Sequence, residues 1–378
     1  MWLFRRQRAA IVVIPSSHKA PPDLWLKVTL RKTLACLLFR AIVSKMGSTD
    51  QIERALESWA QRDFGESARI AALKRLSGGA SQETWAFEVA QGGTNHRLIL
   101  RRVPGGESVA RSSEAVTLAT EAALLGCAQR AGVPVPGVLG VFAPGSNLGE
   151  AFVMNRIEGE TIGRKILRDE AYQSARPLLA AQCGKALAGI HAVDLAALPD
   201  LPHSNGADQI RKYEDIYRGF DLPRPVFELA FSWLKANEPT PQAPVLVHGD
   251  FRLGNLIVDP HGLASVLDWE LAHIGDPRED IAWICVNSWR FGQIENRVGG
   301  FGKLEELLDA YAKAGGARFE AREIDWWEML GSLKWGIMCM IMYEAFRSGG
   351  DPSVERAAIG RRVSETEIDL LNLLEKAL

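Results

Sequence analysis

Three polar side chains in the second half of the chain have the types and spacing of a catalytic site. Asp250 follows the apolar run Val245–Val247, Asn255 stands five residues later, and Asp268 stands thirteen residues after that. Amide and carboxylate oxygens are ligands that Mg²⁺ prefers, so Asn255 and Asp268 are the predicted metal ligands. Asp250 is then the candidate catalytic base, free to accept a proton from an attacking hydroxyl.

A β-hairpin between residues 256 and 267 gives this spacing a geometric reason. If Asp259 faces Ala264 across the turn, the antiparallel register places Asn255 opposite Asp268 at the open end. Any one of these acids alone is more often a turn residue or a helix cap, so the prediction depends on the whole set. Protein-kinase catalytic loops have the same Asp-to-Asn spacing, for the same roles.

The sequence around these residues resembles a known family. The matching motifs are His248-Gly-Asp-Phe-Arg-Leu-Gly-Asn255, Leu267-Asp-Trp-Glu270 and Gly275-Asp-Pro277 with Asp280. They are similar to the aminoglycoside phosphotransferase and choline kinase family, and within it to the kinase domains of acyl-CoA dehydrogenase 10/11-type proteins. The resemblance runs from about Ile70 to the C-terminal helices. It implies a protein-kinase-like bilobal fold and transfer of a nucleotide γ-phosphate to a small-molecule hydroxyl, with the roles given above for the three polar residues.

The resemblance places the nucleotide in the first half of the chain. Gly78, Gly79 and Ser81 stand between two predicted strands, where small residues let backbone N–H groups approach phosphate oxygens. A plain hairpin turn would have the same sequence. Arg101 stands where the family commonly has a phosphate-binding Lys. Arg carries the same positive charge, but it is longer and flatter, so its contact to phosphate has a different geometry. Arg102 is the alternative phosphate contact.

Three further positions match the family's nucleotide and phosphate contacts. Glu121 is the helix carboxylate expected to pair with the strand arginine, with Glu114 as the alternative and a solvated helix acid as the structural interpretation. Met154 lies in the segment whose backbone would bind an adenine edge, although a Met is more often core packing. Arg252, two residues after Asp250, is the candidate contact to the transferring phosphate. The implied cofactors are ATP, with GTP as the alternative, and Mg²⁺.

Other polar residues near these motifs favour structural interpretations. His248 is expected to hold the catalytic loop by hydrogen bonds and His191 to be structural. Asp276 resembles a helix cap, and Asp280 an anchor for the loop. The tryptophans from Trp283 to Trp335 are mostly core, and some of them are candidates for the wall of an acceptor pocket.

Local patterns predict a small sheet followed by a mainly helical part, an α+β arrangement. Trp85, Phe87 and Val89 alternate with polar or small residues, which is typical of a half-buried strand. Strands are predicted over residues 69–76, 84–89, 97–101, 138–142 and 151–156, with one helix over 112–131. Later helices are predicted over residues 178–193, 225–236, 280–290, 304–313, 324–347 and 355–378.

Three segments follow from these patterns. Residues 1–45 are expected to be a basic extension that is disordered or not translated, because Met46 and the residues after it resemble a natural start. Ser48, Thr49 or Asp50 would then cap a helix over 51–62. A membrane-surface anchor is the functional alternative for residues 1–45. Residues 46–157 are the predicted nucleotide-binding lobe, and residues 158–378 the catalytic and acceptor-binding lobe.

Composition limits the classes of partner. After residue 45 the chain holds 35 basic and 45 acidic side chains, which disfavours nucleic-acid binding. The expected partner, a small hydroxylated substrate, is implied by the family resemblance. The five cysteines are scattered without a C-x-x-C pair, which is typical of reduced thiols in a cytoplasmic protein. No segment reaches the roughly 18 apolar residues of a membrane span.

Two other functions compete with phosphotransfer. A non-catalytic, pseudokinase-like nucleotide-binding module is suggested by Arg101 in the place of Lys, whereas the complete set of Asp250, Asn255 and Asp268 argues against it. A metal hydrolase using His248 is weaker, because no second histidine stands at ligand spacing.

Overall fold

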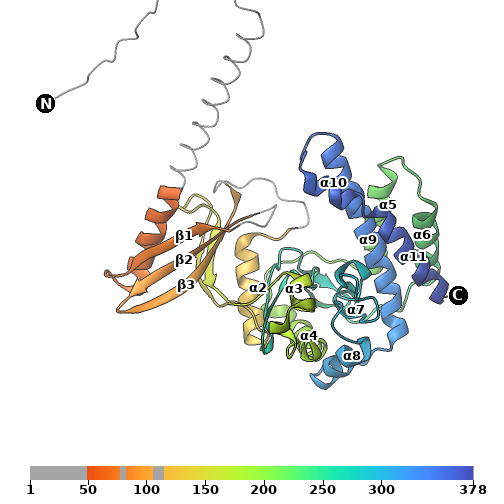
Figure 1. The fold of residues 1–378 in the computed structure, drawn as a ribbon, viewed down its shortest axis with the longest axis horizontal. Coiled ribbons are helices and arrows are strands. Elements are labelled where there is room, and N and C mark those ends of the chain that lie inside the picture. Colours follow the sequence, from red (N-terminus) through yellow and green to blue (C-terminus); the bar gives the residue numbers. More distant parts are fainter. Residues whose placement is uncertain (1–48, 77–81, 105–114, 378) are drawn as a thin grey trace, which may run out of the picture. The chain divides into compact units, whose positions relative to one another are not determined.

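The computed structural model describes residues 49–76, 82–104 and 115–377 of the chain (Figure 1). Residues 49–64 are helical, so this helix is longer at both ends than the predicted span 51–62. From Leu56 onward the chain forms one compact unit. No helix within the described ranges has both the length and the apolar character needed to cross a bilayer.

After residue 64 the chain forms a five-stranded antiparallel sheet, in the order β1-β2-β3-β5-β4. Its strands are β1 (Arg69–Arg75), β2 (Glu83–Gln91), β3 (Thr94–Arg102), β4 (Val138–Phe142) and β5 (Ala151–Asn155). The predicted strand β2 is confirmed, and Trp85, Phe87 and Val89 are all buried. Ala86 is buried as well, so the strand is covered on both faces rather than half-buried. Gly92 and Gly93 join β2 to β3 with positive φ angles, as a two-residue hairpin turn requires.

Helix α2 (Leu118–Arg130) packs against this sheet, and together they form what we call the sheet lobe. The predicted start at residue 112 is wrong, because residues 115–117 are not helical. Thr117 is the N-cap, and its side chain accepts a hydrogen bond from the backbone of Thr120. The backbone N–H of Val116 instead donates to the carbonyl oxygen of Glu270, 2.9 Å away. This long-range contact holds the residue before the cap in a non-helical position.

The described residues from 158 onward are mainly helical and are called the helical lobe. Its helices are α3 (Gly163–Arg168), α4 (Arg176–His191), α5 (Gly206–Arg218), α6 (Pro225–Ala236), α7 (Arg278–Trp283), α8 (Leu304–Lys313), α9 (Ala321–Arg347), α10 (Val354–Gly360) and α11 (Val363–Ala377). The bounds of α6 and α8 are as predicted. The α+β bilobal fold predicted from the sequence is therefore confirmed.

Two predicted helices in this lobe are wrong in extent. The helix predicted over 280–290 ends at Trp283. Val286 has a non-helical ψ of 131°, and a short 3-10 helix (Asn287–Trp289) follows. The helix predicted over 355–378 is two helices, α10 and α11, and the first of them ends at a glycine, a residue that favours helix termination.

Helix α5 was missed, although its sequence contains a start signal. Asn205 accepts a hydrogen bond from the backbone N–H of Asp208, and the Asp208 carboxylate accepts one from the backbone of Asn205. This reciprocal capping box precedes buried Ile210, Tyr213 and Tyr217, which share one face of the helix. The same pattern read from the sequence would have predicted the helix.

Two short strand pairs lie among the helices: β6 (Val245–Val247) with β9 (His273–Gly275), and β7 (Leu256–Asp259) with β8 (Gly262–Val266). The second pair is the predicted hairpin, but its predicted register is wrong. Asp259 pairs with Gly262 rather than with Ala264, and the backbone N–H of Leu267 donates to the carbonyl oxygen of Asn255. Asn255 therefore lies opposite Leu267, one residue before Asp268.

The hairpin also makes backbone hydrogen bonds outside its own ladder. Val258 exchanges two backbone hydrogen bonds with Glu160, of 2.9 and 3.0 Å. The backbone N–H of Val266 donates to the carbonyl oxygen of Pro134, which follows α2. At the turn, the Gln182 side chain of α4 accepts from the backbone of Leu263. The hairpin is thus held to the sheet lobe as well as to the helical lobe.

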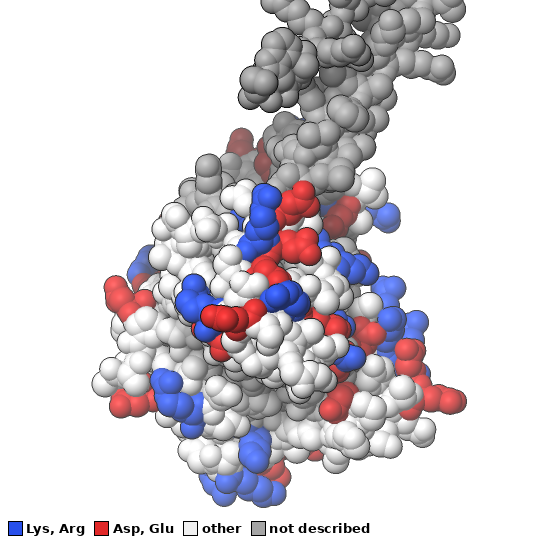
Figure 2. Space-filling model, turned by 90° about the vertical axis from the view of Figure 1, so that its left-hand side faces the viewer, with Lys and Arg blue, Asp and Glu red and all other residues white. Residues whose placement is uncertain are grey.

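The described surface on the β1–β3 side carries both signs of charge. Figure 2 shows lysines and arginines beside aspartates and glutamates on this face. Arg97 of β3 contacts Glu158 at 3.2 Å and Glu88 at 3.8 Å.

Candidate active site

The loop that carries Asp250 begins where the buried strand β6 ends. Leu246 and Val247 are fully buried, and the chain then turns out of the core. Gly249 has a φ of +82°, a conformation that glycine adopts without steric cost. A Cβ atom at this position would collide with the carbonyl oxygen of Leu271. Only glycine therefore fits the turn that presents Asp250.

Asp280 of α7 anchors the same loop, as expected from the sequence. Its fully buried carboxylate accepts the backbone N–H of His248 at 2.7 Å and that of Gly249 at 2.9 Å. The ring of His191 lies 3.3 Å from the same carboxylate and 2.9 Å from the Tyr311 hydroxyl. Buried hydrogen bonds to a charged group are strong, so these contacts fix the loop backbone.

His248 supports the loop from inside. Its Nδ1 accepts the backbone N–H of Asp250 at 3.2 Å, and its Nε2 donates to the carbonyl oxygen of Leu267 at 3.0 Å. The side chain is fully buried. Because both ring nitrogens are engaged, His248 has no nitrogen available for a metal ion, which argues against the hydrolase alternative.

The Asp250 carboxylate is held by three donors. Oδ1 accepts from Trp283 Nε1 at 2.7 Å and from Arg252 Nε at 2.9 Å, and Oδ2 accepts from Asn255 Nδ2 at 2.6 Å. The side chain keeps 15% of its surface exposed. A carboxylate has about four acceptor positions, so one remains for an incoming hydroxyl.

Asn255 and Asp268 stand on either side of the open end of the hairpin. Asn255 uses its amide N–H groups on the backbone and side chain of Asp250, which leaves its amide oxygen as an acceptor. Asp268 has a φ of +66°, a left-handed conformation, and its carboxylate is 34% exposed. One amide oxygen and one carboxylate suit Mg²⁺, which binds few protein ligands and keeps room for phosphate oxygens.

Arg101 on β3 joins the sheet lobe to this end of the hairpin. Its guanidinium contacts Glu121 at 2.6 Å, Asp268 at 2.9 Å and the side-chain oxygen of Gln82 at 2.7 Å. Burial alone would lower the pKa of Arg101, but the two carboxylates raise it above its ordinary value. Arg102 points elsewhere and lies 3.6 Å from Glu83.

The remaining nucleotide residues predicted from the sequence are only partly described. Gly78, Gly79 and Ser81 lie outside the described residues, as does Glu114. Met154 is a buried residue of β5, paired with Ile99 and Val138 in the sheet. Its side chain belongs to the core, and its predicted backbone contact to adenine stays a prediction.

Sequence reasoning missed Trp283 as a site residue. The sequence places Trp283 in a group that is mostly core, with some members as candidates for the wall of an acceptor pocket, and does not predict that its indole N–H donates to Asp250. A signal was present, because Trp283 follows Asp280 by three residues and so shares its helix face. Lys334 of α9 was also missed. Its ammonium lies 5.1 Å from the Trp283 ring centroid and 3.4 Å from Glu279.

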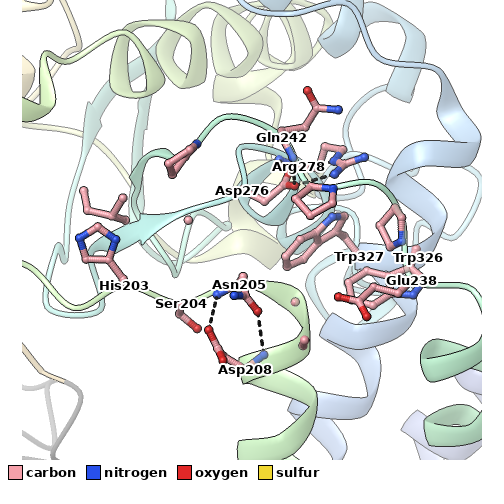
Figure 3. A pocket seen from close by; sticks show the side chains of 17 residues that line it. His203, Ser204, Asn205, Asp208, Glu238, Gln242, Asp276, Arg278, Trp326 and Trp327 are labelled. Atoms are coloured by element: carbon pink, nitrogen blue, oxygen red, sulfur yellow. Dashed lines mark hydrogen bonds and ion pairs between the residues drawn. The ribbon is translucent and has the colours of Figure 1, made fainter.

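A cavity of about 360 Å³ lies at the other end of the β6–β9 pair (Figure 3). Gly275, which pairs with Val245 at the start of β6, lines this cavity, whereas Asp250 follows the end of β6. Arg278 at its wall is already bound to Asp276 at 2.6 Å and to the carbonyl oxygen of Thr240 at 2.8 Å. The cavity is therefore separate from the candidate active site.

The sequence is similar to those of known proteins. A sequence model of the phosphotransferase enzyme family matches residues 72–327. Acyl-CoA dehydrogenase family member 10 of Mus musculus is 31% identical over 221 residues, which are 57% of this chain and 20% of the mouse protein. The chain thus spans about a fifth of the length of this curated relative.

Solved structures share the fold. A choline/ethanolamine kinase family protein from Mesorhizobium loti aligns with a TM-score of 0.56 and 22% identity, over 81% of this chain and 88% of its own. An aminoglycoside phosphotransferase in ternary complex with AMP-PNP and hygromycin B aligns with a TM-score of 0.54 and 17% identity, over 85% of this chain and 99% of its own. At these identities the likeness concerns the fold.

Proposed function

Because the chain belongs to the phosphotransferase enzyme family, we propose that it transfers the γ-phosphate of ATP to a hydroxyl group of a small molecule. The observation that carries the proposal is the Asp250 carboxylate, held by three donors at the end of β6 beside Asn255. In phosphoryl transfer the protein contributes mainly positioning and electrostatic stabilisation. A fixed carboxylate with one acceptor position left is suited to that task.

Asp250 is proposed to orient the acceptor hydroxyl and to accept its proton as the oxygen attacks the γ-phosphorus. Arg252, bound to the same carboxylate, is the proposed contact to the transferring phosphate. Asn255 and Asp268 are the proposed holders of Mg²⁺, which when bound would neutralise charge on the phosphate oxygens.

The nucleotide is proposed to lie against the sheet lobe. Arg101, held by Glu121, offers a buried positive charge next to Asp268. Gly78, Gly79 and Ser81 are the proposed phosphate loop, and the backbone near Met154 the proposed adenine contact. The nucleotide analogue in a solved structure of the same fold supports a nucleotide as a ligand. ATP is the favoured nucleotide, with GTP as the alternative.

The acceptor is proposed to be a hydroxylated metabolite. The mouse relative is named as an acyl-CoA dehydrogenase, which favours a hydroxyacyl-CoA, whereas the solved relative with hygromycin B favours an aminoglycoside. Because the chain spans only a fifth of the mouse protein, no dehydrogenase activity is proposed for it. The proposed boundary between a nucleotide-binding lobe and an acceptor-binding lobe lies between residues 157 and 158.

The test is ATP consumption by the full-length protein with Mg²⁺, against aminoglycosides, choline-like alcohols and hydroxyacyl-CoAs. Asp250→Asn should abolish turnover with the best acceptor and leave ATP affinity, measured by calorimetry, within about twofold of wild type. Asp259→Asn, at the closed end of the hairpin, is the control and should keep full activity. Equal turnover in Asp250→Asn would contradict the mechanism, and ATP binding without turnover in wild type would support the non-catalytic alternative.

A further inference from the structure

We propose that Trp283 is a positioning residue for the phosphotransfer reaction, in which its indole N–H fixes the orientation of the Asp250 carboxylate. The inference rests on the proposed function and adds a residue to it. The contact is short, with 2.7 Å between Trp283 Nε1 and Asp250 Oδ1. Trp283 is 5% exposed, so little solvent competes for the hydrogen bond.

The two donors to Asp250 Oδ1 differ in how firmly they are held. Arg252 reaches the oxygen through a long, flexible side chain that is 26% exposed. Trp283 has only two rotatable side-chain bonds and a rigid, buried ring, so its donor has fewer alternative positions. With Oδ1 occupied by both donors and Oδ2 by Asn255, the remaining acceptor position of the carboxylate has a fixed direction.

Charged and aromatic groups around the ring hold the indole of Trp283. The Trp289 ring lies 5.5 Å away at an angle of 59°, and the Lys334 ammonium lies 5.1 Å from the ring centroid. A desolvated cation over a tryptophan is a strong cation–π contact. Lys334 is in turn held by Glu279 at 3.4 Å and by the Tyr213 ring at 5.7 Å. Burial alone would lower the pKa of Lys334, but Tyr213 and Glu279 raise it, so the cation is kept.

Helix α7 holds the catalytic loop at two points one turn apart. Asp280 binds the backbone of His248 and Gly249, and Trp283 binds the side chain of Asp250. In contrast, the indole N–H groups of four other buried tryptophans have no hydrogen-bond partner within the described ranges, namely Trp85, Trp289, Trp327 and Trp335. The Trp283 N–H is therefore distinguished from these by its bond to the catalytic carboxylate.

The test compares two substitutions that each remove one indole N–H and keep an aromatic ring. Trp283→Phe removes the donor to Asp250. Trp327→Phe removes an N–H without a described partner, in a residue that lines the separate cavity of Figure 3. Phosphate release from MgATP, with water as the acceptor, gives kcat and KM for the full-length variants, and calorimetry gives their ATP affinity.

We expect Trp283→Phe to lower kcat by about tenfold or more, as for the loss of a hydrogen bond to a charged group, with KM and ATP affinity within about twofold of wild type. Trp327→Phe should match wild type in all three quantities. A kcat for Trp283→Phe equal to that of Trp327→Phe would overturn this inference and leave the proposed function unaffected. Wild-type protein that releases no phosphate with water and consumes no ATP with any acceptor of the panel would overturn the proposed function and this inference together.

A second readout reports the contact without activity. In protein labelled with ¹⁵N at the indole nitrogens, the Trp283 resonance is identified by its loss in Trp283→Phe. Asp250→Ala should shift this resonance, because the indole loses its carboxylate acceptor, and should leave the Trp327 resonance in place. An unmoved Trp283 resonance would show that the two groups are not bonded in solution and would overturn the inference.

Discussion

Arg101 and Asp268 form an ion pair with 2.9 Å between Nη2 and Oδ1, although they are 167 residues apart in the sequence. The arginine belongs to β3 of the sheet lobe, and the aspartate follows the hairpin of the helical lobe. The guanidinium is also bound to Glu121, which is fully buried. The proposed phosphate-binding cation is thus connected directly to a proposed magnesium ligand.

Removal of the Arg101 side chain should destabilise the protein strongly. Arg101→Ala takes the closest cation away from buried Glu121, and such losses cost roughly 3–5 kcal/mol of unfolding free energy. Arg97→Ala on the same strand removes an arginine that is 59% exposed and should cost less than about 1 kcal/mol. Urea denaturation of the two variants measures the difference, and similar midpoints would contradict the structural role of Arg101.

Substitution of Asp268 should change the response to magnesium. If Asp268 and Asn255 hold Mg²⁺, Asp268→Asn should raise the Mg²⁺ concentration for half-maximal ATP turnover by about tenfold or more, because a charged oxygen ligand is lost. Removal of Mg²⁺ with EDTA should stop turnover in wild type. Asp259→Asn, at the closed end of the same hairpin, should leave the magnesium titration unchanged. Identical titrations for the Asp268 and Asp259 variants would assign the metal elsewhere.

Substitution by alanine should destabilise the protein more at Gly249 than at another glycine that also has a positive φ angle. Gly249 and Gly315 both have positive φ angles, +82° and +101°, so alanine costs about 1–2 kcal/mol at each on conformational grounds. A Cβ at Gly249 also collides with the carbonyl oxygen of Leu271, whereas a Cβ at Gly315 meets no atom within 4 Å. Thermal unfolding should show the larger loss for Gly249→Ala, together with lower ATP turnover. Equal losses would indicate that the loop can move.

His273 should make stability fall as the pH rises through neutrality. Burial alone would lower the pKa of His273, but Glu279, 3.0 Å away, raises it above its ordinary value. The stabilisation is then fully present below the unfolded pKa of about 6.5 and is lost as the pH rises through the higher folded pKa. Relative to His273→Gln, wild type should be more stable near pH 6, with a smaller advantage near pH 9, in urea denaturation. A constant difference across this range would contradict the charged pair.

Much of the fold could be predicted because the signals are local. The alternation of Trp85, Phe87 and Val89 predicts β2, and the bounds of α6 follow from Pro225 at its first turn and an apolar face. The hairpin register could not be predicted in this way. A bulge between Ile257 and Val258 shifts it, and Val258 is the residue bonded to distant Glu160. The register there depends on a tertiary contact, which the local sequence pattern does not predict.

The residues of the candidate site also divide into those that local spacing predicts and those that only the tertiary fold brings together. Asp250 and Asn255 lie five residues apart in one loop, so their spacing alone predicts that they meet, and the structure brings them to 2.6 Å. Trp283 meets Asp250 only because α7 packs beside the loop, and a tryptophan among apolar residues is usually core. Lys334 comes from a still more distant helix. The functional roles of these residues stay proposals, which the experiments above address.

The β7–β8 hairpin has a consequence for how the protein loses its structure. Its backbone is bonded to Pro134 beyond α2 and to Glu160 after β5, while its turn is bonded to Gln182 of α4. If one lobe unfolded alone, these hydrogen bonds would break, and the buried backbone groups that form them would lose their partners. The two lobes should therefore unfold as one cooperative unit, with coincident transitions rather than a stable half-folded intermediate.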